Sequence, residues 1–112
     1  SSAASDVYKR QRKRRPSGQT IQVLGVLLAR PDEAQYGLEI SKAARLLPGS
    51  IYTITARLME LGWLDDEWED QSDARDGRPA RRYYKLTPKG RDAAAQAVAE
   101  FQAAFAGKGA LT

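Results

Sequence analysis

Two sets of polar and cationic side chains in this sequence have types and spacing suited to chemistry. The first set lies along one short segment and comprises Ser50, Tyr52, Thr53 and Arg57. The second set is a pair of guanidinium groups on either side of Gly77, those of Arg75 and Arg78. Hydroxyl and guanidinium groups of this kind form hydrogen bonds with base edges and with phosphate oxygens. The chemistry that they suggest is therefore binding of a nucleic acid.

A helix over about Gly49 to Leu61 would carry the first set. Ile51, Ile54, Leu58 and Leu61 recur at helical spacing, which gathers them on one face. Gly62 follows where a glycine commonly ends a helix. Rotation of 100° per residue then turns Tyr52 and Thr53 away from the apolar face and leaves Ser50 and Arg57 on its flanks. The alternative is an ordinary amphipathic helix whose polar face meets water, and this helix alone does not decide between the two.

A hairpin should follow this helix and carry the second set. Trp63 to Glu69 alternates as a strand does, Asp70 to Pro79 is a polar loop, and Arg81 to Leu86 is the return strand. Leu64, Trp68, Tyr84 and Leu86 are expected in the core, with Trp63 packed beside them. In an alternative reading, Trp63 and Trp68 line a small-molecule site in a cleft between two subunits.

The charges of this hairpin are strongly segregated, although the whole chain has a net charge of only +4. Residues 60–73 contain seven acids and no base, whereas residues 75–91 contain seven bases and one acid, so a local positive field can attract an anion. Arg81 and Lys85 share a face with Asp65, Glu67 and Glu69, so cross-strand ion pairs should use them. Arg75 and Arg78, near the tip of the loop, are therefore preferred for contact with a nucleic acid.

Three further helices complete the expected element order. They run from about Gln19 to Arg30, from about Tyr36 to Leu46, and from Thr87-Pro88 to about Ala106, where Gly107 to Gly109 should end the last one. That helix carries a narrow apolar seam formed by Ala94, Val98, Phe101 and Phe105. The seam could pack on its own domain. It is longer than one small domain can cover, so pairing with the first helix of a second subunit is favoured.

Composition excludes several classes of function. The chain has no Cys and no His, which removes disulfides, zinc fingers and Cys or His nucleophiles. It shows no Gly-rich phosphate loop, no nucleophile elbow and no acidic pair suited to catalysis, so we expect no enzyme and no cofactor. No apolar run approaches the roughly 20 residues of a membrane span, and a cytoplasmic location is expected.

The N-terminal residues are expected to lie outside the fold. Ser1 to Gln11 matches one reading frame of a DNA-sequencing adapter, which indicates an artefact; the alternative is a native disordered leader. Arg12 to Arg15 form a basic run that could add a non-specific contact. The expected organisation is a disordered basic segment (1–18), a DNA-binding domain (19–87), a dimerisation helix (88–106) and a flexible tail (107–112).

Several motifs together resemble the PadR-like family of winged-helix transcriptional regulators. The matching pieces are TIQVLGVLLARP, YGLEISKAARL, LLPGSIYTITARLMELGWL and GRPARRYYKLTPKGR. The resemblance implies a bacterial, cytoplasmic, dimeric repressor on an inverted repeat, with Tyr52 on the DNA backbone and a basic wing at Arg75 to Arg82. Thr53 replaces a frequent Pro, and Leu47 replaces a small capping residue. The last helix lacks the Trp found in drug-sensing members.

The expected fold is mainly α with a small β-hairpin, a winged helix-turn-helix in the order α-α-α-β-β-α. The expected function is sequence-specific binding of double-stranded DNA by a homodimeric repressor associated with the nucleoid. The alternative is a winged-helix protein-interaction module that does not bind DNA, with the acidic stretch Asp65 to Asp73 serving a basic partner. Whether a small-molecule effector acts on the protein stays open.

Overall fold

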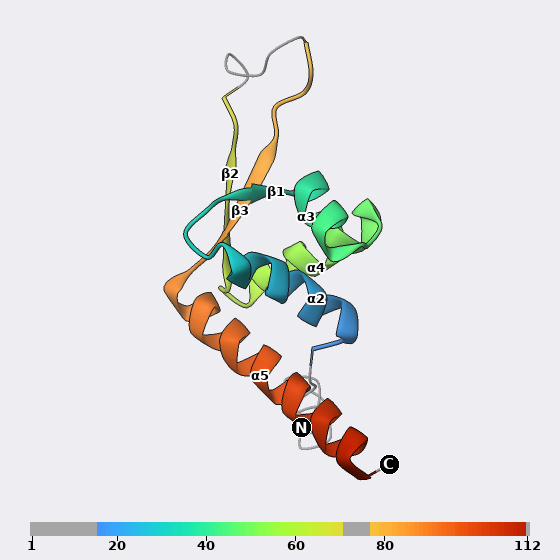
Figure 1. Cartoon of the computed structure of the whole chain (residues 1–112). Coiled ribbons are helices and arrows are strands. Elements are labelled where there is room, and N and C mark those ends of the chain that lie inside the picture. The colour runs from blue at the N-terminus through green and yellow to red at the C-terminus, as the bar shows by residue number, and fades with distance from the viewer. Residues whose placement is uncertain (1–15, 71–76, 112) are drawn as a thin grey trace, which may run out of the picture.

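Three short helices, a small sheet and one long helix make up the described part of the chain. The structure is a computed structural model that describes residues 16–70 and 77–111, with side chains as far as residue 106. Its elements are α2 (Gly18–Ala29), β1 (Gln35–Tyr36), α3 (Gly37–Ala44), α4 (Pro48–Glu60), β2 (Leu64–Trp68), β3 (Arg82–Leu86) and α5 (Pro88–Leu111). In Figure 1 the β2–β3 ribbon extends away from the helices on one side, and α5 runs along the opposite side. Within the predicted terminal segments, residues 1–15 and 112 lie outside the described residues.

The winged helix-turn-helix fold predicted from the sequence is confirmed, with two differences. A two-residue strand, β1, joins the free edge of β3 to give a three-stranded antiparallel sheet in the order β1-β3-β2. Two residues are too few for an alternating pattern, so the sequence did not reveal this strand. The last helix also continues to Leu111, so the end predicted at Ala106 is wrong. The cost of glycine in a helix, about 1 kcal/mol per residue, does not stop α5 at Gly107.

The core is formed where α2, α3, α4 and the base of the sheet meet. Its buried apolar side chains are those of Ile21, Val23, Leu24, Leu27, Ile40, Ala44, Ile51, Ile54, Leu58, Leu64, Tyr84, Leu86 and Ala94. The apolar face predicted for α4 is thus confirmed for three of its four residues, while Leu61 remains exposed at the helix end. Three polar residues are also buried, Gln35, Ser41 and Thr55. The amide of Gln35 in β1 donates to the Val26 carbonyl and accepts from Arg30.

The end of α4 is closed by a Schellman motif. Gly62 adopts a φ of 76°, a left-handed conformation that glycine reaches without steric cost. Its N–H donates to the Met59 carbonyl, and the N–H of Trp63 donates to the Leu58 carbonyl. Gly62 therefore ends α4 as predicted and turns the chain directly into β2.

The start of α5 is fastened to this same turn. The Thr87 hydroxyl accepts a hydrogen bond from the Gly90 N–H at 2.9 Å, which is the predicted N-cap, and donates to the Gly62 carbonyl at 2.7 Å. The Thr87 N–H donates to the Trp63 carbonyl at 3.0 Å. A Cβ at Gly90 would overlap the backbone of Trp63, so only glycine permits this approach. The ends of α4, β3 and α5 are held at one point.

Replacing Gly90 by Ala should lower the free energy of unfolding by about 1–3 kcal/mol, the usual cost of overfilling a close contact. Helix propensity alone would predict the opposite sign, because Ala favours helices by about 1 kcal/mol over Gly. Denaturant unfolding followed by circular dichroism measures the change.

Gly25→Ala in α2 is the matched control, since nothing lies within 4 Å of a Cβ built there. It should stabilise the protein by about 0.5–1 kcal/mol. An equal gain in stability for both variants would contradict the close contact at Gly90.

Candidate nucleic-acid interface

The outward face of α4 carries the first set of candidate residues. Tyr52 is 66% exposed, and Thr53 and Arg57 are also exposed, whereas Ser50 is half-buried. The opposite face of the helix packs into the core through Ile51, Ile54, Thr55 and Leu58. The predicted orientation of this helix is confirmed, because its apolar face packs into the domain and its polar face is exposed.

The polar groups of α4 differ in what they can still bind. The Thr53 hydroxyl donates to the Gly49 carbonyl at 3.2 Å, and the buried Thr55 hydroxyl donates to the Tyr52 carbonyl. Arg57, by contrast, has no ion pair with any of the residues that the structure describes. Its guanidinium carries five N–H donors, so Arg57 is the residue of this face best able to bind an additional acceptor.

Arg78, a candidate from the loop, is held by an acid of its own hairpin. Its guanidinium makes two hydrogen bonds with the Glu69 carboxylate, at 2.7 and 3.1 Å, and the Glu69 side chain is only 16% exposed. These bonds hold the pKa of Glu69 below its ordinary value, against partial desolvation, so the pair persists at neutral pH. Its contribution to stability is lost only as the pH falls through that lowered pKa. Arg75 lies outside the described residues.

Arg82 connects the hairpin with α4, a role that the sequence analysis did not assign. Its Nε donates to Asp66 at 2.8 Å, and one of its terminal nitrogens lies 3.4 Å from the Met59 sulfur of α4. The same guanidinium lies 5.3 Å from the ring centre of Tyr84 and 5.7 Å from that of Trp68. The sequence did contain a signal for this role, because Arg82 falls on the core-facing side of its strand. A cation in that position needs polar or aromatic partners.

The remaining hairpin residues divide between the two faces of the sheet. Arg81 lies 4.2 Å from the ring centre of Tyr36, so it does bind within the sheet, although by a cation–π contact rather than by the expected cross-strand ion pair. Lys85 lies opposite Asp65 in the strand register and is exposed, but it forms no ion pair with any described residue, so the cross-strand pair expected for it is not found. Leu64, Tyr84 and Leu86 are buried as predicted.

The prediction that Trp68 is a core residue is wrong. Trp68 is 61% exposed, because β2 leaves the helices after Leu64 and projects into the ribbon seen in Figure 1. Trp63 is half-buried against the core, as expected. The apolar groove among the described residues is lined by neither Trp, and a site formed by Trp63 and Trp68 between two subunits stays a prediction.

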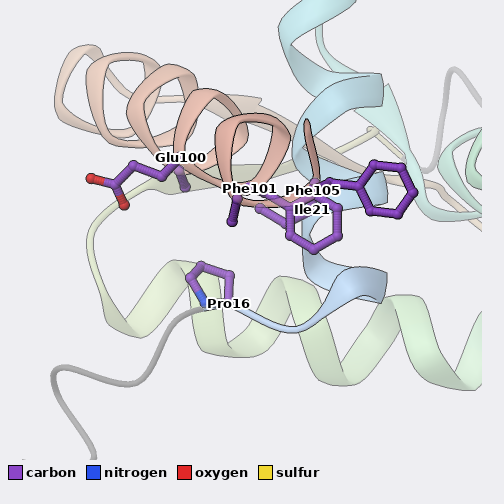
Figure 2. Close-up of a pocket in the computed structure, with 7 residues that line it drawn as sticks. Pro16, Ile21, Glu100, Phe101 and Phe105 are labelled. Atoms are coloured by element: carbon purple, nitrogen blue, oxygen red, sulfur yellow. The ribbon is translucent and has the colours of Figure 1, made fainter. Parts of the chain in front are cut away.

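The predicted dimerisation seam of α5 passes gradually from the core to the surface. Ala94 is buried and Val98 is half-buried, whereas Phe101 is 42% and Phe105 is 73% exposed. The two Phe side chains line an apolar groove of about 300 Å³ together with Pro16 and Ile21 at the start of α2 (Figure 2). The first half of the seam thus packs on its own domain, and the second half presents apolar surface.

The family comparison matches most of this region. A family model described as the transcriptional regulator PadR-like family matches residues 23–96, about two thirds of the chain. The match extends from α2, through α4 and the hairpin, into α5. A comparison with curated proteins gave no significant match.

Solved structures share the fold at low sequence identity. MepR of S. aureus bound to DNA is 20% identical, with a TM-score of 0.56 over 82% of this chain and 66% of that one. A mutant of ZitR of Lactococcus lactis is 13% identical, with a TM-score of 0.63 over 88% and 62%. A candidate DNA-binding protein from Ralstonia eutropha JMP134 is 25% identical, with a TM-score of 0.56 over 72% and 95%.

This chain spans only 54% and 64% of the length of two mutant forms of MepR that it also resembles. Among the described residues, no helix is both long and apolar enough to cross a membrane.

Proposed function

This chain belongs to the PadR-like family of transcriptional regulators, and we propose that it binds double-stranded DNA sequence-specifically, as a homodimeric repressor on an inverted repeat. A family of transcriptional regulators is not a family of enzymes, so the role of the chain is not catalytic. The proposed place of action is the nucleoid in the cytoplasm.

The observation that carries the proposal is the outward face of α4. Tyr52, Thr53 and Arg57 are exposed on one side of a helix whose other side is buried. The hairpin starts at the end of this helix and extends away from the helices (Figure 1). The major groove of B-DNA, about 12 Å wide, admits one α-helix of this kind. Arg57 would contact a base edge, Tyr52 and Ser50 the backbone, and Thr53 the groove floor.

The hairpin would follow the DNA backbone as a wing. Arg75 and Arg78 are the proposed phosphate contacts. In the free protein, however, the charge of Arg78 is already neutralised by its ion pair with Glu69. An acid that holds an arginine in the absence of DNA lowers the affinity for any polyanion. The wing would therefore position the protein on a duplex while adding little to its non-specific affinity.

The second half of α5 would supply the dimer interface. Phe101 and Phe105 are exposed, and their groove also includes Ile21 of α2, so α5 of one subunit can pack against α2 and α5 of its partner. Burial of two Phe side chains contributes a few kcal/mol. Two copies of α4 would then contact half-sites about one helical turn apart. Occupancy of such a site over a promoter would exclude polymerase, which is the basis for the repressor role.

Arg57→Ala should reduce discrimination between specific and non-specific duplexes by about 1–3 kcal/mol, since one base-edge contact is lost. The full chain is first used to select binding sequences from a pool of random duplexes. Mobility-shift titrations of the selected duplex and of a scrambled duplex then give the two affinities for each variant.

Lys85→Ala is the matched control, because it removes the same charge from an exposed side chain of the sheet, away from α4. It should lower the affinity for the selected and the scrambled duplex by the same factor and leave discrimination unchanged. Selection of no sequence from the pool, at low salt, would instead favour a protein-interaction module. Equal discrimination by Arg57→Ala and the original protein would refute the role of Arg57.

Glu69→Gln should strengthen DNA binding and steepen its salt dependence, because Arg78 is then free to neutralise a phosphate. The slope of log affinity against log salt should increase by about one, the value for one phosphate contact. Titrations at a series of salt concentrations measure it. The double variant Glu69→Gln/Arg78→Gln should lose the gain. If both variants bind equally tightly, removing the Arg78 guanidinium costs no affinity, and Arg78 makes no contact with the DNA.

Replacing both Phe101 and Phe105 by Glu should convert the dimer to a monomer, since two charges would be placed in an apolar contact. Sedimentation velocity measures the mass, and a duplex with two half-sites should be bound much more weakly. Gln102→Glu, on an exposed neighbouring position, adds a charge on the same turn and should leave the dimer intact. A monomeric original protein would contradict the proposed assembly.

A further inference from the structure

A large apolar side chain lies exposed at the point where α4 begins. Leu47 occupies the N-cap position and is 76% exposed. Its side chain makes no capping hydrogen bond, a role usually taken by Ser, Thr, Asp or Asn. Helix α4 thus lacks the polar cap that would satisfy its first N–H groups, and shows an isobutyl group there instead. Stability of the helix gives no reason for leucine at this position.

The middle of the outward face of α4 carries two small side chains that bear methyl groups, and the exposed Glu60 carboxylate follows them in the last turn of the helix. By the 100° rotation of a helix, Thr53 and Ala56 lie at the middle of this face, with Tyr52 and Arg57 on its two edges. The Thr53 hydroxyl already donates to the Gly49 carbonyl, which leaves its methyl group as the less committed end of the side chain. Ala56 is exposed and carries only a methyl group. These two methyl groups lie on the outward face, and Leu47, which precedes the first turn of α4, adds an exposed isobutyl group at the start of the helix.

We propose that this interface reads thymine C5-methyl groups, and that Leu47 is a specificity-determining residue that packs on one of them. The C5-methyl of thymine is the apolar group among the features that base pairs display in the major groove. An exposed Leu, a Thr methyl and an Ala methyl match that group, whereas the guanidinium of Arg57 suits a guanine. The inference rests on the proposed DNA binding and adds which base pairs each half-site must contain: mainly A·T pairs, with thymines facing the start of α4.

The test removes methyl groups from the DNA without changing its hydrogen-bond pattern. The selected duplex is synthesised with deoxyuridine in place of thymidine, first throughout and then at one position of each half-site at a time. Uracil keeps the O4 acceptor and lacks the C5-methyl. Each contacted methyl should lower the affinity of the full chain about fourfold, the equivalent of roughly 0.8 kcal/mol.

Leu47→Ala identifies the contact made by Leu47. In this variant the affinity for thymidine duplexes should fall, and the loss caused by deoxyuridine should disappear at one position of each half-site while persisting at the others. Leu61→Ala is the matched control, because Leu61 is also exposed but lies at the other end of α4. It should retain the original sensitivity at every position. Thermal melting of both variants shows that the fold is kept.

The outcomes separate this inference from the proposed function. Sequence-specific binding with equal affinity for thymidine and deoxyuridine duplexes overturns methyl reading and leaves DNA binding intact. Unchanged deoxyuridine sensitivity in Leu47→Ala overturns the assignment of Leu47. A Leu47→Ala variant that changes self-association in sedimentation, with its sensitivity to deoxyuridine unaltered, makes Leu47 a protein contact and overturns it too. Absence of binding to any duplex overturns both the function and the inference.

Discussion

The hydrogen bonds of Thr87 and the absence of a side chain at Gly90 hold the domain together where three elements meet. Thr87 binds the carbonyls of Gly62 and Trp63, and Gly90 lets the first turn of α5 lie directly against that backbone. Helix α4, the hairpin and α5 all begin or end within a few residues of this point. Their relative directions are therefore set here, and so is the position of the outward face of α4 relative to the wing and to the α5 seam.

Several charged side chains of the hairpin already contact other residues of the same chain in the free protein. Glu69 holds Arg78, Asp66 holds Arg82, and Arg81 lies over Tyr36. These contacts stiffen a ribbon that projects beyond the core, where apolar burial contributes little. Exposed ion pairs of this kind are worth about 0–1 kcal/mol each, so their main effect is on geometry and on the local field. Arg57 of α4 differs because it has no ion pair among the described residues.

The orientation of segments with periodic apolar residues could be predicted, whereas the burial of some individual side chains could not. The apolar spacing of Ile51, Ile54 and Leu58 was enough to orient α4, since a helix of fixed pitch has one apolar side. The alternation in the hairpin placed Leu64 and Tyr84 correctly and Trp68 wrongly. An alternating pattern shows which residues lie on the same face of a strand. It does not show how far along the strand the helices cover that face.

By itself, the sequence determined the order of the helices and the hairpin, the buried side of α4, the turn at Gly62 and the resemblance to the family. Each of these depends on neighbours within a few residues, so local spacing and backbone preference suffice. Tertiary structure alone decided that β1 joins the sheet at Tyr84, that Gly90 meets Trp63, that Arg82 reaches Met59, and that Glu69 captures Arg78. Some of these contacts join residues far apart in the chain. In others, several side chains of the same kind could serve as the partner, and only the folded structure brings one of them within reach.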